Sequence, residues 1–208
     1  MDEYYVCLIE EVGPEIHRRE APLSSMEKYT GVLPSQLLLH WHRYGWSGYG
    51  NGVFWCVNPA EYEVTMRCWL SESGIPHPET YHVIARGAFG DIYMWQQGTG
   101  SWLTVNAVYA RYMRTTRHIP AERFDDEIKI FFASFDHTSN DFEDLFEKAL
   151  TALGPLEPDE MYGFVPAIAL GGPADLKHLQ KVKTIEHLTF LSQLTPLTDW
   201  GFPDLDSL

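Results

Sequence analysis

Residues 81–105 read YHVIARGAFGDIYMWQQGTGSWLTV, and this stretch decides the fold. Glycine-containing tetrapeptides interrupt it twice, which is typical of turns between strands. Three short runs rich in β-branched and aromatic residues remain between the turns: Tyr81–Ala85, Asp91–Gln96 and Ser101–Val105. Two successive hairpins follow, so we predict an antiparallel sheet meander at the centre of the protein.

The segment before the meander predicts two helices around one buried strand. Residues 34–44 begin with a proline and carry apolar side chains at helical spacing, which indicates an amphipathic helix. Gly45–Gly52 holds four glycines in eight residues, so we expect a tight loop there instead of a regular strand. This loop leads into a buried strand at Val53–Val57. Asn58-Pro59 then gives a helix-start signal, and we expect that helix to end near Gly74.

The segment after the meander is dominated by helical patterns. Apolar residues recur every three or four positions after Ser139-Asn140 and stop at Gly154, which predicts an amphipathic helix with Asn140 at its start. Residues 162–170 indicate a buried strand, and residues 184–194 a final helix capped by Thr184. Pro196–Leu208 is predicted to be a surface tail. Residues 106–125 give no clear pattern.

These patterns together predict an α+β protein. We expect an antiparallel sheet meander with flanking helices, followed by a helix-rich C-terminal segment that packs against it. Near residue 125 the sequence pattern changes from aromatic, strand-like runs to helical periods. This change suggests two domains, residues 1–125 and residues 126–208.

The charge balance excludes one class of partner and favours another. The chain has 29 Asp and Glu against 15 Lys and Arg, a net charge of −14. Nucleic-acid affinity comes largely from cationic side chains, so we expect no direct contact with DNA or RNA. The same charge attracts a basic protein and speeds its association. The alternative is that the acids serve only solubility.

Location and redox state can also be anticipated from the sequence. No apolar stretch approaches the length needed to span a bilayer, and the N-terminus carries acids where a signal peptide would be positive. We therefore expect a cytoplasmic protein that does not associate with membranes. Cys7, Cys56 and Cys68 are an odd number without a Cys-x-x-Cys pair, so we predict that they are reduced and mostly buried.

No pattern in the chain is typical of catalysis. Neither glycine cluster has the spacing of a phosphate-binding loop, and no serine or cysteine has the context of a nucleophile. His40 and His42 flank Trp41, but side chains two positions apart on a helix point in different directions, which disfavours a metal site. We predict no enzymatic activity, no metal and no cofactor.

Two clusters of charged residues are candidates for a site. Arg86 and Asp91 stand at the two ends of a predicted turn, where they can form a structural clamp or line a ligand pocket. Asp159 and Glu160 directly precede a predicted strand. They can act as general acid and base, although solvated acids at a strand entrance are more common.

Several segments of the sequence resemble known protein domains. Residues 33–58, including LPSQLL and YGWSGYGNGVFWCVN, resemble the GAD-like domain, as do Ile84–Arg86 and Ala88–Asp91. The second half is similar to the domain that follows it in immunity proteins of type VI secretion DNase effectors. The residues that carry this second resemblance include Asp141-Phe142, Leu145-Phe146, Asp159–Pro166, Leu170–Gly172, Lys181-Val182 and Glu186–Leu188.

The resemblance implies an immunity protein that binds its cognate effector toxin, a nuclease with a basic surface, and neutralises it. It also implies a pocket of small-ligand ancestry. We therefore take the following residues as candidates for a recognition surface: Trp46, Arg86, Phe89, Asp91, Asp159, Glu160, Tyr162, Lys181 and His187. Two alternatives stay open. One is a small-molecule-binding or enzymatic protein that uses Arg86, Asp91 and Glu160, and the other is a scaffold outside toxin biology.

Overall fold

The computed structural model describes residues 2–115 and 119–201. Its α-helices are α1 (Glu3–Val12), α2 (Leu23–Tyr29), α3 (Ser35–Tyr44), α4 (Pro59–Leu70), α5 (Phe124–Ala133), α6 (Phe146–Leu153) and α7 (Thr184–Ser192). Its strands are β1 (Glu15–Arg19), β2 (Trp46–Tyr49), β3 (Phe54–Cys56), β4 (Tyr81–Gly87), β5 (Asp91–Gln96), β6 (Trp102–Asn106), β7 (Arg111–Arg114), β8 (Glu160–Phe164), β9 (Leu179–Lys183) and β10 (Thr198–Asp199).

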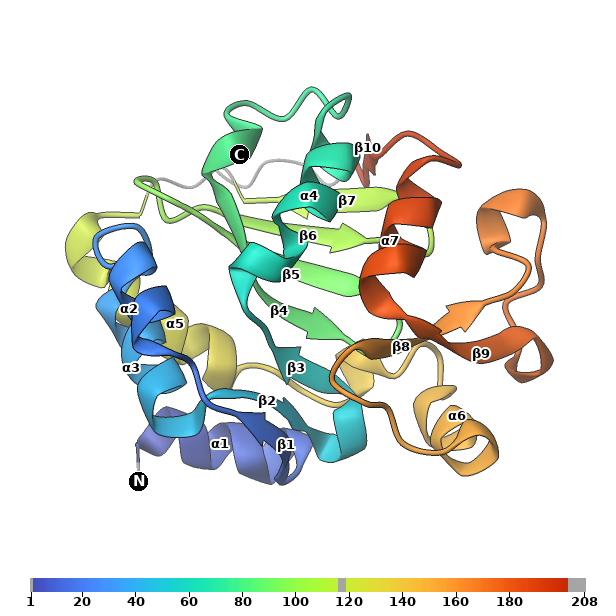
Figure 1. Ribbon diagram of the computed structural model, residues 1–208, viewed down its shortest axis with the longest axis horizontal. Helices are drawn as coiled ribbons and strands as arrows, with labels where there is room; N and C mark the ends of the chain where they lie inside the picture. Colours follow the sequence, from blue (N-terminus) through green and yellow to red (C-terminus); the bar gives the residue numbers. More distant parts are fainter. Residues whose placement is uncertain (1, 116–118, 202–208) are drawn as a thin grey trace.

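One large sheet organises the described part of the chain. Eight strands lie in the order β1-β2-β3-β4-β5-β6-β7-β10, and β8 and β9 form a separate antiparallel pair (Figure 1). Neighbours in the large sheet are antiparallel, apart from the parallel pair of β7 and β10. The predicted meander is β4, β5 and β6. The predicted α+β class, with flanking helices and a helix-rich C-terminal segment, is confirmed.

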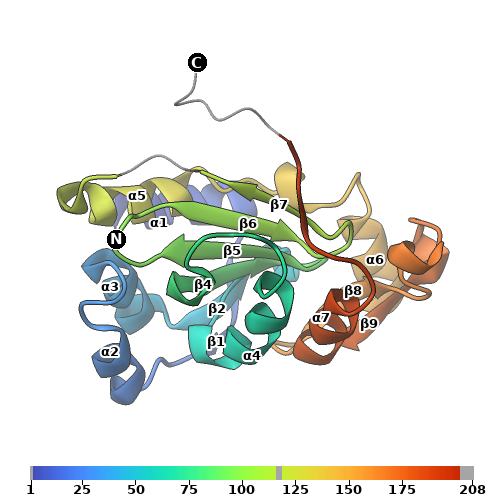
Figure 2. The same cartoon turned by 90° about the horizontal axis from the view of Figure 1, so that it is seen from above.

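Helices cover both faces of the large sheet. α1 and α5 lie on one side of it, and α4 and α7 lie on the other (Figure 2). α5 packs against α1 and α3, while α4 packs against β4 and α7. One continuous cluster of buried residues runs from Tyr4 to Leu197. Large rings such as Trp41, Trp55 and Trp95 are fully buried in it, and each ring contributes a large apolar area to the core.

The two helices predicted before the meander are confirmed with small shifts. α3 begins directly after Pro34 and buries Leu37 and Trp41 on its inner face. In α4, the Asn58 side chain accepts a hydrogen bond from the Ala60 N–H at 3.1 Å. α4 ends at Leu70, before the predicted stop at Gly74. These helices follow from local signals, namely the cap, the proline and the apolar period.

The glycine-rich segment at residues 45–52 contains a strand, so the prediction of a loop throughout is wrong. Trp46–Tyr49 form β2, which pairs with β1 and β3. A Cβ at Gly48 would lie 2.9 Å from three atoms of the Trp55 ring. Glycine is therefore needed because the indole lies across β2. The turn itself falls at Gly50–Gly52, where all three residues have positive φ.

The helix after Asn140 begins later than predicted. α6 starts at Phe146, because Phe142, Glu143 and Asp144 have φ of 50°, 58° and 63° and form a left-handed turn. Asn140 does not cap a helix. Its side chain accepts a hydrogen bond from the Tyr93 hydroxyl at 2.6 Å and donates one to a backbone carbonyl at 3.2 Å. The apolar period identified the buried face of the helix but not its start.

Three further differences concern the C-terminal half. The strand predicted over residues 162–170 is wrong beyond Phe164, where β8 ends and irregular chain with a 3₁₀ turn follows. Thr184 is the first residue of α7, and no side-chain hydrogen bond caps this helix. The sequence pattern did not reveal β7 or α5, which lie in or directly after the stretch without a clear pattern.

Both edges of the large sheet have irregular features. At one edge, β10 replaces part of the predicted surface tail, and Thr198 donates its N–H to the Ala110 carbonyl at 3.0 Å. Residues 202–208 of that tail lie outside the described residues. At the other edge, the register of β1 against β2 shifts between Ile16 and Arg19, and His17 has a φ of 49°.

The cysteines are free, but the expectation of burial is wrong for two of them. Cys56 is buried, whereas Cys7 and Cys68 are exposed. Among the described residues, no helix combines the length and the apolar character that crossing a membrane requires.

Gly48→Ala is expected to destabilise the protein by about 1–3 kcal/mol, because the new methyl group overlaps the buried Trp55 ring. In a Trp55→Leu background the same substitution should cost clearly less, because the overlapping ring is gone. Urea unfolding of the four proteins of this cycle measures both costs. An equal cost in the two backgrounds would rule out the ring as the cause.

Candidate functional site

Arg86 connects the meander to the C-terminal segment. Its side chain is fully buried at the end of β4. Nη2 donates to the carbonyl oxygens of Pro158 and Glu160 at 3.0 and 2.9 Å, and Nη1 donates to the Gly87 carbonyl at 3.3 Å. Burial lowers the pKa of the guanidinium, but arginine keeps its charge in proteins. Hydrogen bonds from a charged donor are among the stronger ones, so Arg86 holds the entrance of β8 against β4.

Several further contacts fix this junction. The Arg86 Cζ lies 4.9 Å from the centroid of the Trp55 ring, a cation–π contact. The Tyr162 N–H donates to the Ala88 carbonyl at 2.9 Å, so β8 is tied to the meander through its backbone as well. The His17 ring stacks near Trp55, and its Nδ1 lies 3.9 Å from the Glu157 carboxylate.

The predicted clamp between Arg86 and Asp91 is wrong. Within the described residues Arg86 has no ion pair, and its hydrogen bonds go to backbone carbonyls. Asp91 instead accepts a hydrogen bond from the Asn106 amide at 2.8 Å. Burial raises the pKa of Asp91 to about 6, because the charged carboxylate loses hydration. The side chains diverge because Arg86 points toward Trp55 and β8.

Phe89 and Tyr162 belong to the core. Both are fully buried, and their ring centroids lie 5.7 Å apart. Phe89 also contacts the Phe142 ring at 5.3 Å. The Tyr162 hydroxyl donates to the Gly154 carbonyl at 2.8 Å, and burial raises its pKa to about 12. These two rings belong to the core next to the site and are not accessible to a partner.

Asp159 and Glu160 form a charge ladder with β9. Lys183 Nζ lies 2.8 Å from the Asp159 carboxylate, and Lys181 Nζ lies 3.2 Å from Glu160. The hydrogen bond from Lys183 lowers the pKa of Asp159. For Glu160, burial acts to raise the pKa, but the Glu157 N–H and Lys181 outweigh it and the pKa is lowered. Both acids are thus charged at neutral pH, which does not suit a general acid.

Trp46 and His187 occupy structural positions. Trp46 is buried, and the Arg19 Cζ lies 5.0 Å from the centroid of its ring. His187 of α7 is half-buried, and burial lowers its pKa. A Cβ at Gly163 would lie 2.7 Å from the His187 Nε2, so the imidazole packs directly on the backbone of β8.

The nine candidate residues therefore differ in accessibility. Buried are Trp46, Arg86, Phe89 and Tyr162, half-buried are Asp91, Glu160 and His187, and exposed are Asp159 and Lys181. The structure brings most of them together around β8, whereas Trp46 lies apart on β2. Their role in recognition stays a prediction.

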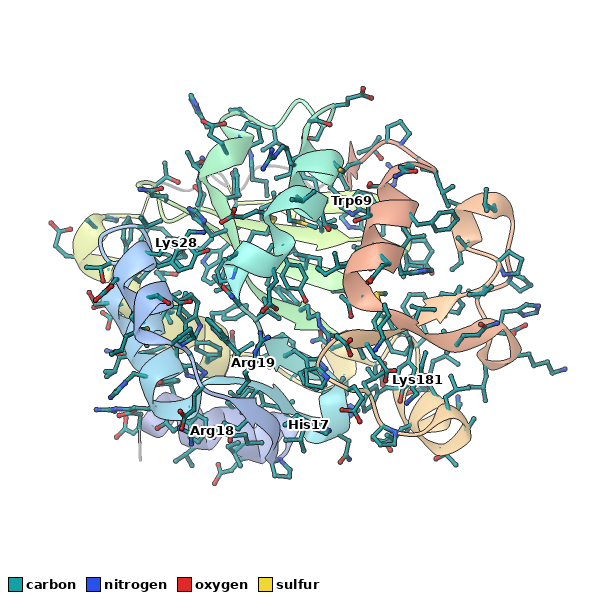
Figure 3. All side chains as sticks on the ribbon, in the orientation of Figure 1. His17, Arg18, Arg19, Lys28, Trp69 and Lys181 are labelled. Carbon is teal, nitrogen blue, oxygen red and sulfur yellow. The ribbon has the colours of Figure 1, made fainter. Side chains whose placement is uncertain are left out.

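Several basic residues lie on the side of the molecule that carries α4 and α7. His17, Arg18, Arg19, Lys28 and Lys181 all lie on the face turned toward the viewer in Figure 3. Arg19 and Lys28 contact carboxylates of α4, with N–O distances of 2.8 and 2.6 Å to Glu61 and Glu63. Part of the positive charge on this face is therefore neutralised by acids of α4.

The described residues also contain a cleft of about 310 Å³, between α4 and the start of β4. Its lining includes Tyr62, Met66 and Val83, with Glu63 and Arg67 among the charged residues. Arg86, Asp91 and Glu160 do not line it. A second cavity, beside His187, has only about 10 Å³, which is too small for an organic ligand.

The histidines of α3 occupy different environments. His40 is buried, with its Nδ1 3.3 Å from the Tyr4 hydroxyl and its Nε2 3.5 Å from Cys56 Sγ. Burial lowers its pKa to about 3. His42 is exposed. Among the described residues, no group of three or more His, Cys, Asp or Glu side chains is arranged to hold a metal ion.

Sequence reasoning missed one group of accessible aromatic residues. Tyr109 and Trp200 are 41% and 46% exposed, and their ring centroids lie 6.4 Å apart. Tyr109 also stacks on Phe142 at 5.8 Å. These rings come from three distant segments, so no local pattern indicates that they meet.

Comparison with known proteins finds a family match in each half of the chain. Residues 3–109 match the model of the GAD-like domain, and residues 125–195 match that of the C-terminal domain of the type VI secretion immunity protein Tdi1. The crystal structure of Atu4351 from Agrobacterium tumefaciens is similar in fold, with a TM-score of 0.86 and 22% identity over 96% of this chain and 94% of that one. No curated protein matches the sequence significantly.

Arg86→Met is expected to destabilise the protein by about 2–4 kcal/mol, because it removes the hydrogen bonds that the buried guanidinium donates to the carbonyls of residues 158 and 160. Arg67→Met on the exposed side of α4 is the matched control, and it should change stability by less than about 0.5 kcal/mol. Urea unfolding measures both. A cost for Arg86→Met no larger than that of the control would show that the junction does not depend on the guanidinium.

Asp91→Asn should make stability less sensitive to pH. The folded state raises the pKa of Asp91 from 3.8 to about 6, so the folded state holds this proton more tightly than the unfolded chain. The stability that Asp91 contributes is complete below pH 4 and is lost as the pH rises to about 6. The variant should therefore be more stable than the wild type by about 2–3 kcal/mol at pH 7.5, with no advantage near pH 4. Thermal unfolding across this range measures the difference, and a difference independent of pH would contradict the assignment.

Proposed function

The chain belongs to the GAD-like domain family, and from this membership and the C-terminal Tdi1 match we propose that it neutralises a cognate type VI secretion toxin, a DNase, by binding it. The C-terminal match supports a type VI secretion immunity protein. Action by binding alone, without an enzymatic step, agrees with the pairing of Asp159 and Glu160 in a charge ladder. The proposed place of action is the bacterial cytoplasm, where such a toxin meets DNA.

The net charge of −14 is the observation that carries the choice of a nuclease. An enzyme that acts on DNA presents a cationic surface to the phosphate backbone. An acidic protein is attracted to that surface over a distance, which raises the association rate. We therefore propose that the toxin has a basic surface and that the complex reaches a Kd in the nanomolar range or below.

We also propose that residues 1–125 and 126–208 form two domains that act as one unit. The family matches to residues 3–109 and 125–195 support a division near residue 125. The hydrogen bonds of Arg86 to Pro158 and Glu160 support joint action, because they place the second region firmly against the first.

A small-ligand function is the second candidate, and the cleft between α4 and β4 is the observation that favours it. Its volume of about 310 Å³ is at the lower end of the range for ligand pockets. In this form the alternative no longer uses Arg86, Asp91 and Glu160. A small molecule retained in the purified protein would support it.

Co-expression tests the proposed function. The product of the reading frame adjacent to this gene should kill its host when it is produced alone, and the host should survive when this protein is produced with it. A toxin inactivated in its own active site serves as the control, because it should be harmless with or without the partner. Toxicity that persists beside well-folded immunity protein would contradict the proposal.

A further inference from the structure

The turn between β6 and β7, at one end of the large sheet, carries part of an exposed aromatic centre. Tyr109 of this turn stacks on Phe142, with an interplanar angle of 17° and 5.8 Å between centroids. Trp200, which follows β10, meets Tyr109 edge-on at 6.4 Å. We call Tyr109, Phe142 and Trp200, together with Glu143 and Asp144, the Tyr109 surface. Figure 2 shows the segment between α5 and α6 running near the end of β6 and β7.

The aromatic centre is anchored to the core. The Phe142 ring contacts Phe89 at 5.3 Å and Phe164 at 5.2 Å, and both of these rings are buried. The backbone at Trp200 is held because its N–H donates to the Tyr112 carbonyl at 2.9 Å. The Phe142 ring and the backbone at Trp200 are therefore held in place before a partner arrives, which reduces the conformational freedom lost on binding.

Acidic residues border the aromatic centre. Glu143 and Asp144 are both exposed, and neither forms an ion pair within the described residues. The Glu143 carboxylate is near enough to Tyr109 to add to the effect of burial in raising its pKa. Aromatic residues at the centre and charged residues at the rim are the usual anatomy of a protein–protein interface.

Two other charged regions of the protein fit a basic partner less well. On the face that carries α4 and α7, acids are already used in ion pairs such as Arg19–Glu61, Lys28–Glu63 and Lys181–Glu160. On α5, Asp126 and Glu127 pair with Lys129 and Arg123. Exposed rings beside carboxylates without such partners make the Tyr109 surface a better match for a cationic protein than either of these two regions.

We propose that the Tyr109 surface is the docking site for a basic protein partner, with the rings of Tyr109, Phe142 and Trp200 as its centre and Glu143 and Asp144 as its rim. This inference rests on the proposed function, in which that partner is the cognate toxin. The hydroxyl of Tyr109 has no hydrogen-bond partner among the residues described by the structure, so it is available to the partner. The carboxylates guide the approach of the partner, and the rings provide most of the affinity.

Tyr109→Ala tests the aromatic centre. The probe is the product of the adjacent toxin gene, inactivated in its own active site, and binding to the full-length protein is measured by surface plasmon resonance. We expect the Kd to rise at least about tenfold, as for a central interface tyrosine. Phe190→Ala is the matched control, because Phe190 is 44% exposed against 41% for Tyr109 but lies on α7. It should bind like the wild type.

Glu143→Gln/Asp144→Asn tests the acidic rim. At low salt, the association rate of this double variant should be at least about threefold lower than that of the wild type. The rate should also depend less on the salt concentration. Glu10→Gln/Glu11→Gln on α1 is the matched control, because it removes the same charge from two other exposed positions and should leave the rate nearly unchanged. Circular dichroism and urea unfolding of every variant exclude loss of folding as the cause.

The outcomes separate the two proposals. If the wild type does not bind the toxin, the proposed function fails and the docking site fails with it. If the wild type binds and the Tyr109 and rim variants bind equally well, the docking site is overturned while the proposed function stands. A drop in affinity for the control variants equal to that for the Tyr109 variants also overturns it. So does a wild type that is dimeric without toxin and becomes monomeric on Tyr109→Ala, because a second copy then occupies the surface.

Discussion

The burial of Arg86 is the constraint on which the rest of the structure depends. A guanidinium without water must find acceptors, and here these are the backbone carbonyls of Pro158 and Glu160. That requirement brings the entrance of β8 to the end of β4. The cation also lies over Trp55, whose ring lies across β2 and requires glycine at position 48. One charged side chain thus links the two family regions and packs on the ring that requires glycine at position 48.

The parts of the fold that could be predicted depend on neighbours in sequence. The cap at Asn58, the period of α3 and the three runs of the meander all act over a few residues, and all are found in the structure. The parts that failed depend on contacts between different elements of the fold. Gly48 is explained by Trp55, and the orientation of Arg86 by carbonyls more than 70 residues away. The left-handed turn at Phe142–Asp144 interrupts a helical period that continues through it.

The candidate site shows the same division. The prediction of a basic partner comes from composition, because the net charge of −14 is a property of the whole chain. Most of the residues that the family resemblance indicated do gather around β8, but Arg86, Phe89 and Tyr162 are buried there. The exposed rings of Tyr109 and Trp200 belong to segments that meet only in the folded protein. The proposed kind of partner therefore comes from the sequence, whereas the proposed place of binding comes from the fold.

The margins of the large sheet have a consequence for how the protein behaves at high concentration. An outermost strand normally offers free N–H and C=O groups on which another molecule can build a continuous sheet. Here the short parallel strand β10 covers part of one margin, and the left-handed His17 with its register shift disrupts the other. Sheet-to-sheet polymerisation is thereby disfavoured at both ends. Such a protein can therefore accumulate to a high concentration in a cell without forming fibres.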